Sequence, residues 1–140
     1  MLSKMQQGFA NNNHQEVMGD MFAPNLKWDW SDGTKGEGSQ DELFAIFKKT
    51  WGFMVSSFIP TNPMITVDHE NGVICINSSL VINIDGGMPE ANLVNNSVVF
   101  VMKVVDGKFT SWEGYWDNKF PPMLEAMSKV MAKLESQPSA

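Results

Sequence analysis

The sequence predicts an α+β fold, in which helices cover one curved, mostly antiparallel sheet. The main evidence is a set of three long apolar runs in the second half of the chain: Val73–Asp85, Ala91–Val105 and Lys108–Asp117. Residues that favour tight turns flank these runs, at Asn71-Gly72, Gly86-Gly87 and Asp106-Gly107. This pattern indicates a meander of long strands, and 140 residues suffice for one core. We therefore expect a single domain over residues 1–134 and a frayed tail over residues 135–140.

Two short helices are expected before the first strand. The first is indicated by the helical spacing of Leu2, Met5 and Phe9. The second begins at Asn13, which can act as its N-cap, and ends at Pro24. Its apolar face consists of Val17, Met18, Met21 and Phe22. Such helices would cover one face of the sheet.

A strand with alternating polarity comes next. Leu26–Trp30 alternates apolar and polar residues, so its three apolar side chains share one face. Lys27 and Asp29 share the other face. The following residues, 31–38, are polar and rich in glycine, and we expect a loop there.

The longest helix is expected over residues 40–57. Ser39 and Glu42 form a capping-box pattern, and apolar residues recur every three or four positions from Leu43 to Phe58. Two prolines close this segment, and a strand is expected over Met64–Asp68.

Each long strand of the meander has one strongly apolar face. The even-numbered positions of Val73–Asp85 and Ala91–Val105 carry most of the large aliphatic side chains. The odd-numbered rows are mixed, yet they retain Val81, Val99 and Val101. A second copy of the chain would cover these valines, so we expect a homodimer formed sheet to sheet.

A last helix follows the sheet. Pro is tolerated in the first turn of a helix, so Phe120-Pro121-Pro122 can open one. Its apolar stripe consists of Leu124, Met127, Val130, Met131 and Leu134.

Composition excludes several classes of function. The chain has a net charge of −6 and contains no arginine, so we expect no nucleic-acid partner. Cys75 is the single cysteine, and no paired metal-ligand motif occurs, so we expect neither a metal nor another cofactor. No apolar run is long enough to span a membrane, and the start of the chain has no secretory pattern. We therefore expect a cytoplasmic protein.

Two stretches carry a family resemblance: MFAPNLKWDWSDGTKGEG before the long helix, and VVDGKFTSWEGYWD at the end of the sheet. In their setting of helices, strand, long helix and meander, they resemble the NTF2-like superfamily, which includes ketosteroid isomerase and the SnoaL-like polyketide cyclases. The resemblance implies a cone-shaped α+β barrel with an apolar pocket, and many members are dimers. It implies a pocket rather than one particular chemistry.

Several chemistries of this superfamily conflict with the sequence. A ketosteroid isomerase-like site needs a carboxylate base on the first strand, but that position matches Trp30, and the adjacent Asp29 points to the other face. A limonene-epoxide hydrolase-like site needs an arginine, which this chain lacks. A scytalone dehydratase-like site uses paired histidines, and we do not expect His14 and His69 to meet.

SnoaL-like cyclisation relies on one Asp late in the sheet as acid and base. Asp117 is the nearest candidate for that Asp, and His14 or Tyr115 could assist it. Asp117 could equally cap the turn that follows the strand. The candidate catalytic residues are therefore Asp117, His14 and Asp29, in an acid/base isomerisation, cyclisation or dehydration that needs no cofactor.

The candidate ligand-binding residues are mostly aromatic. They are Trp28, Trp30, Phe47, Trp51, Met54, Asn96, Phe100 and Tyr115. Asn96 interrupts an apolar row, where it could hold a ligand carbonyl or pair with a neighbouring strand. The aromatic residues could line a pocket for an apolar, ring-bearing, polyketide- or terpenoid-like molecule. They could also fill the cone completely, as in a non-catalytic interaction module.

Overall fold

The computed structural model describes residues 19–50, 52–87 and 93–136. These residues form one six-stranded sheet with the strand order β2-β1-β6-β5-β4-β3. The elements in chain order are η1 (Gly19–Met21), β1 (Phe22–Trp30), β2 (Lys35–Gly38), α3 (Gln40–Thr50), η2 (Gly52–Met54), β3 (Val55–Asp68), β4 (Val73–Ile84), β5 (Leu93–Val105), β6 (Lys108–Trp116) and α4 (Pro121–Ser136). The first expected helix lies outside the described residues.

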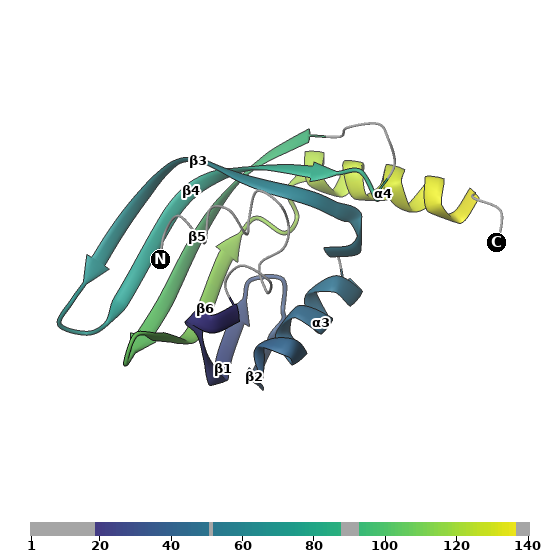
Figure 1. Ribbon diagram of the computed structural model, residues 1–140. Coiled ribbons are helices and arrows are strands. Elements are labelled where there is room, and N and C mark those ends of the chain that lie inside the picture. Colours follow the sequence, from purple (N-terminus) through teal and green to yellow (C-terminus); the bar gives the residue numbers. More distant parts are fainter. Residues whose placement is uncertain (1–18, 51, 88–92, 137–140) are drawn as a thin grey trace.

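The predicted meander is confirmed, and one parallel pairing is added to it. Strands β3, β4, β5 and β6 pair antiparallel in sequence order. Strand β1 pairs parallel with β6, so the sheet is mixed. Figure 1 shows these strands as one curved sheet that is not closed, with α3 and α4 beside it on the same side. The α+β fold class is therefore as predicted.

The core lies on the face of the sheet that the alternation predicted. In β4 and β5 the even-numbered positions from Ile76 to Ile84 and from Val94 to Met102 are buried. The odd-numbered positions between them are half-buried or exposed. Since successive side chains of a strand point to opposite faces, one face packs against the helices.

The expectation of a helix up to Pro24 is wrong at its C-terminal end. Phe22, expected on the helix, is the first residue of β1, and Met21 lies in a single 3-10 turn. Pro24 is tolerated in the strand because the register between β1 and β6 shifts between Phe22 and Lys27. Residues 13–18 of the expected helix lie outside the described residues.

The loop expected over residues 31–38 is half wrong, because Lys35–Gly38 forms the edge strand β2. Gly36 faces Trp28 across this hairpin. A Cβ atom at Gly36 would lie 2.8 Å from Cζ2 of Trp28, so the indole lies directly over the glycine backbone. The glycines that indicated a loop are therefore part of a strand, and Gly36 lies beneath the indole ring of Trp28.

The longest helix is shorter than predicted, and the next strand is longer. The N-cap is confirmed, since the Glu42 backbone N–H donates to Oγ of Ser39 over 3.3 Å. Helix α3 nevertheless ends at Thr50, and β3 already begins at Val55. Apolar residues at these positions are buried in either structure, so periodicity could not separate the two. The prolines at 60 and 63 fit because β3 is an edge strand.

The predicted last helix is confirmed as α4. Its first residues are the two adjacent prolines, and it continues to Ser136, beyond the expected start of the frayed tail. Met123, Ala126 and Val130 are buried against the rest of the molecule. No helix in the described part of the chain is both long and apolar enough to cross a membrane.

Candidate functional site

A cavity of about 190 Å³ lies between the buried face of the sheet and both helices. Helix α3 contributes Phe44 and Phe47 to its wall, and α4 contributes Met123, Leu124 and Met127. The last helix therefore covers the cavity. The remaining wall comes from β1, β3, β4, β5 and β6 and from the turns at their ends, and it is almost entirely apolar.

Aromatic rings from three strands form the base of the cavity. The ring of Trp30 packs edge-to-face on those of Trp112 and Trp116, with centroids 5.4 and 6.0 Å away. Phe100 packs in the same way on Trp112 at 5.5 Å. Edge-to-face pairs contribute roughly 0.5–1.5 kcal/mol each beyond their buried area. The rings therefore hold one another in place and leave a preformed space.

Gly114 leaves the room that these rings occupy. It lies between Phe100 of β5 and Trp30 of β1 in the registers of the sheet. A Cβ atom at Gly114 would lie 3.0 Å from the Trp116 ring and 3.1 Å from Cδ1 of Trp30. A side chain at this position would therefore be tight against the aromatic base, and the rings would have to shift by a few tenths of an ångström to admit it.

The turn after β1 is tied to β6 and places a carboxylate at the cavity. The hydroxyl of Ser31 donates to the backbone oxygen of Trp116 over 2.9 Å and accepts from its N–H over 3.0 Å. Asp32 lines the cavity, and its Oδ1 accepts a hydrogen bond from the Thr34 N–H. Among the lining residues that the structure describes, Asp32 is the one with an ionisable carboxylate, and none carries a positive charge.

Asn96 is the buried polar side chain among the described residues of the wall. It is 6% exposed, and it lines the cavity. Its Nδ2 donates to the backbone oxygen of Asp117 over 3.1 Å and approaches the sulfur of Met123 at 3.7 Å. A backbone oxygen can only accept, so this contact fixes which end of the amide is the nitrogen. Asn96 therefore anchors the segment that follows β6 and also lines the cavity.

The indole nitrogen of Trp30 is buried and has no acceptor among the described residues. Leaving a buried donor unpaired costs roughly 1–3 kcal/mol. Neighbouring atoms cover this nitrogen completely, although the ring itself lines the cavity. A small molecule can therefore reach the polar group of Asn96, but not the indole nitrogen of Trp30.

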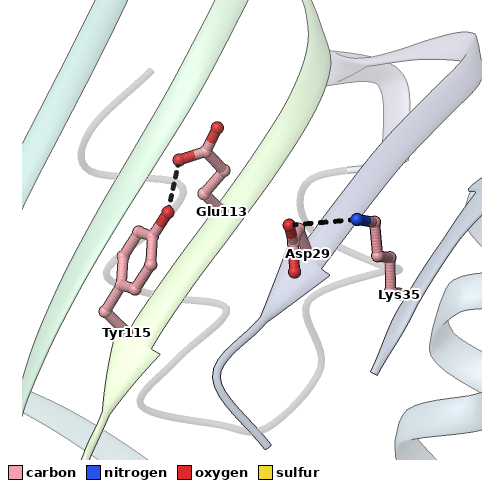
Figure 2. A network of polar contacts seen from close by, with 4 residues as sticks. All are labelled: Asp29, Lys35, Glu113 and Tyr115. Carbon is pink, nitrogen blue, oxygen red and sulfur yellow. Dashed lines mark hydrogen bonds and ion pairs between the residues drawn. The ribbon is translucent and has the colours of Figure 1, made fainter. Parts of the chain in front are cut away.

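Two predicted site residues lie on the opposite, exposed face of the sheet. Figure 2 shows Asp29 beside Lys35, at 3.9 Å, and the hydroxyl of Tyr115 donating to Glu113 over 2.7 Å. This bond to a carboxylate raises the pKa of Tyr115 above its ordinary value, because loss of the proton would place two negative charges together. Neither Asp29 nor Tyr115 reaches the cavity.

The other predicted residues divide into three groups. Four of them line the cavity together: Trp30, Phe47, Asn96 and Phe100. Trp28 and Met54 are buried outside its wall, and Asp117 is exposed, with its Oδ1 accepting from the Lys119 N–H. His14 and Trp51 lie outside the described residues.

Some wall residues were not among the predicted site residues. Leu80, Ile82 and Val98 belong to the even-numbered apolar faces, so the alternation already contained the signal for them. Asp32 and Asn118 follow strand ends, and no periodicity marks a turn residue as part of a cavity. Within the described ranges, no group of three or more His, Cys, Asp and Glu side chains is arranged to hold a metal.

Comparison of the sequence with protein-family models and with curated proteins gives no match. Solved structures do match. An NTF2-like protein of unknown function from Burkholderia pseudomallei is 14% identical, with a TM-score of 0.69 over 91% of this chain and 94% of that one. A protein assigned as a SnoaL-like polyketide cyclase from Jannaschia is 15% identical, with a TM-score of 0.63 over 98% and 92% of the two chains.

An LEH-like epoxide hydrolase from M. tuberculosis is also similar. It is 16% identical, with a TM-score of 0.63 over 96% of this chain and 91% of that one. At such low identity the likeness concerns the fold alone, and it extends over nearly the whole length of each chain. The chain therefore has the fold of the NTF2-like superfamily.

Proposed function

We propose that this protein binds a small, apolar, ring-bearing organic molecule in the cavity between its sheet and its helices. The observation that carries the proposal is a preformed space of about 190 Å³ with an almost entirely aromatic and aliphatic wall. Small-molecule sites are typically concave and apolar, with few polar groups that fix orientation. Removing apolar ligand surface from water into this space supplies the binding free energy.

The names of the fold neighbours support an organic ligand of the polyketide or terpenoid kind. One neighbour is assigned as a polyketide cyclase and another is an epoxide hydrolase. Binding is a better-supported function than acid/base catalysis, because Asp29 and Asp117 lie off the cavity wall. Asp117 stays a candidate acid or base only for a ligand that extends beyond the cavity, and Asp32 is the carboxylate on the wall itself.

Filling the cavity tests this proposal. We expect wild-type protein to bind indane, and Leu80→Trp, which places an indole in the cavity, to bind it at least about tenfold more weakly. Leu80→Met is the matched control, since it conserves side-chain volume at the same position and should keep the affinity. Calorimetric titration measures both affinities. Equal binding by the Trp variant, or no binding by the wild type, would sink the proposal.

We also propose that the opposite face of the sheet pairs with a second copy of the chain. Val81, Val99 and Val101 are only half-buried there, and Tyr115 is 48% exposed. Large exposed apolar patches are uncommon on monomers, which supports a covered face. Sedimentation equilibrium measures the mass, and a dimer has about twice the 15.6 kDa of one chain. The second candidate, a module that binds a different protein through this face, predicts the mass of a single chain.

A further inference from the structure

We infer that the cavity selects a small cyclic alcohol or phenol, whose hydroxyl group donates a hydrogen bond to Oδ1 of Asn96. This inference rests on the proposed function, because it names the chemical class of the molecule that the cavity binds. The sequence suggested that Asn96 could hold a ligand carbonyl, for which its amide nitrogen would donate. In this inference its amide oxygen accepts instead.

The amide of Asn96 has one end occupied and one end available. Nδ2 already donates to the backbone oxygen of Asp117 over 3.1 Å and lies against the sulfur of Met123. Both side-chain contacts of Asn96 to described residues come from this nitrogen, so Oδ1 keeps its capacity to accept. Because Asn96 is 94% buried within an apolar wall, an acceptor there gains most from a ligand that donates.

Of the other described lining residues, Ser97 and Asn118 can also donate, but unlike Asn96 they are not buried. No lining residue in the described ranges carries a positive charge, and the indole nitrogen of Trp30 is covered by neighbouring atoms. A ligand carbonyl facing Oδ1 would bring two acceptors together and leave both unpaired. A ligand hydroxyl pairs with Oδ1, so the difference between the two ligands should be about tenfold or more in affinity.

The volume of the cavity limits the size of the ligand. A space of about 190 Å³ exceeds only modestly the ~150 Å³ engineered cavity that binds benzene. It is smaller than the roughly 300–1,000 Å³ of sites for drug-sized ligands. One ring or two small fused rings fit this space, whereas a compound with four fused rings does not. The ligand is therefore a compact cyclic molecule with one hydroxyl group.

Three molecules with one carbon skeleton test the inference: indane, 2-indanol and 2-indanone. Their affinities are measured by titration calorimetry for wild type and for Asn96→Leu. We expect the ratio of the dissociation constants of 2-indanol and indane to rise about tenfold in the variant. The affinity for 2-indanone should not fall, because the variant removes an oxygen that repels the carbonyl.

Ser78→Ala is the matched control. Ser78 is a second buried polar residue on the same face of the sheet, and it does not line the cavity. Its hydroxyl lies 3.1 Å from the Thr61 backbone oxygen and 2.9 Å from that of Ser79, so its one hydrogen has an acceptor. This variant should keep the ratio within about twofold. A measurement on the wild type needs no variant: with 2-indanol bound, the proton beside its hydroxyl should show nuclear Overhauser contacts to the Asn96 amide.

The outcomes separate this inference from the proposed function. If indane binds but the ratio does not change in Asn96→Leu, the inference is overturned and the proposed function stands. A selective loss of 2-indanone would identify Nδ2 as the recognition group and overturn the inference as well. If the alcohol's proton lies against the aromatic base and away from Asn96, the inference also fails. Binding of none of the three molecules overturns both proposals.

Discussion

At the scale of single residues, the hydrogen-bond partner of each side-chain atom tells more about the role of a residue than its type does. The sequence marks Asn96 as a polar residue in an apolar row, and the structure confirms that it is buried there. The contact between Nδ2 and the backbone oxygen of Asp117 decides that an acceptor remains for the cavity. Asp117 contributes through this backbone oxygen, while its carboxylate caps the turn before α4.

The pKa of Tyr115 can be measured directly by absorbance, because Tyr115 is the only tyrosine of the chain. Its hydroxyl donates to Oε2 of Glu113, and this bond raises the pKa of the phenol above the ordinary value of 10.0. We expect its absorbance titration to have a midpoint above 10.0 in the wild type and a lower midpoint in Glu113→Gln. An identical midpoint in both proteins would contradict the contact.

The hydrogen bond between Tyr115 and Glu113 also predicts how the stability of the fold changes with pH. A group whose pKa is raised by folding stabilises the folded state below its unfolded pKa and loses that effect as pH rises through its folded pKa. The Tyr115–Glu113 contact therefore stabilises the fold at neutral pH and ceases to do so in alkali. The difference in Tm between wild type and Glu113→Gln should accordingly shrink above about pH 10.

At the scale of elements, the edge hairpin of β1 and β2 shows how a glycine-rich stretch becomes a strand. Strand β2 pairs with β1 only over four residues, and Trp28 covers Gly36 at its centre. The edge strand therefore depends on one large side chain that packs over a position without a side chain. The long edge strand β3 differs. It tolerates its prolines because one side of its backbone has no partner among the described strands.

Gly36→Val tests the hairpin. A Cβ atom at this position would lie 2.8 Å from Cζ2 of Trp28, so the indole must move and its packing is lost. We expect a loss of about 1–3 kcal/mol in the free energy of unfolding, measured by urea denaturation. Lys35→Ala is the control in the same strand, because its ion pair with Asp29 is exposed and should change stability by less than ~0.5 kcal/mol. Equal effects of the two substitutions would contradict this packing.

At the scale of the whole molecule, the two faces of one sheet serve different purposes. The even-numbered face of β4 and β5 packs against α4 and, together with α3, surrounds the cavity. The odd-numbered face carries the Tyr115–Glu113 and Asp29–Lys35 contacts, together with the valines that we propose a second copy covers. Ligand and partner would thus bind on opposite sides of the same strands.

The substitution Val99→Lys tests whether the outer face forms the dimer independently of ligand binding in the cavity. A lysine in the middle of the outer face would have to be buried in a sheet-to-sheet dimer, and burying an unpaired charge is costly. We expect at least about tenfold weaker dimerisation in sedimentation experiments, with the affinity for indane unchanged. Lys103, already exposed on the same row, provides the control variant Lys103→Ala, which should leave the mass unchanged. A Val99→Lys protein that remains dimeric would contradict pairing through this face.

The sequence by itself determined the elements whose signals are local and repeated. Alternating apolar residues predicted the faces of β4 and β5, glycine-containing turns set their order, and the adjacent prolines marked the start of α4. These signals suffice because the periods of a strand and a helix follow from backbone geometry alone. Four of the residues that line the cavity, Trp30, Phe47, Asn96 and Phe100, follow from the same patterns.

Only the tertiary structure decided where α3 ends, that residues 35–38 form a strand, and that β1 lies parallel to β6. Each of these depends on contacts between residues far apart in the chain, and burial favours an apolar residue equally in a helix and in a strand. The cavity likewise depends on contacts between residues far apart in the chain. Whether aromatic rings fill a space or surround it depends on how Gly114 and α4 position them, and no local pattern in the sequence encodes that arrangement.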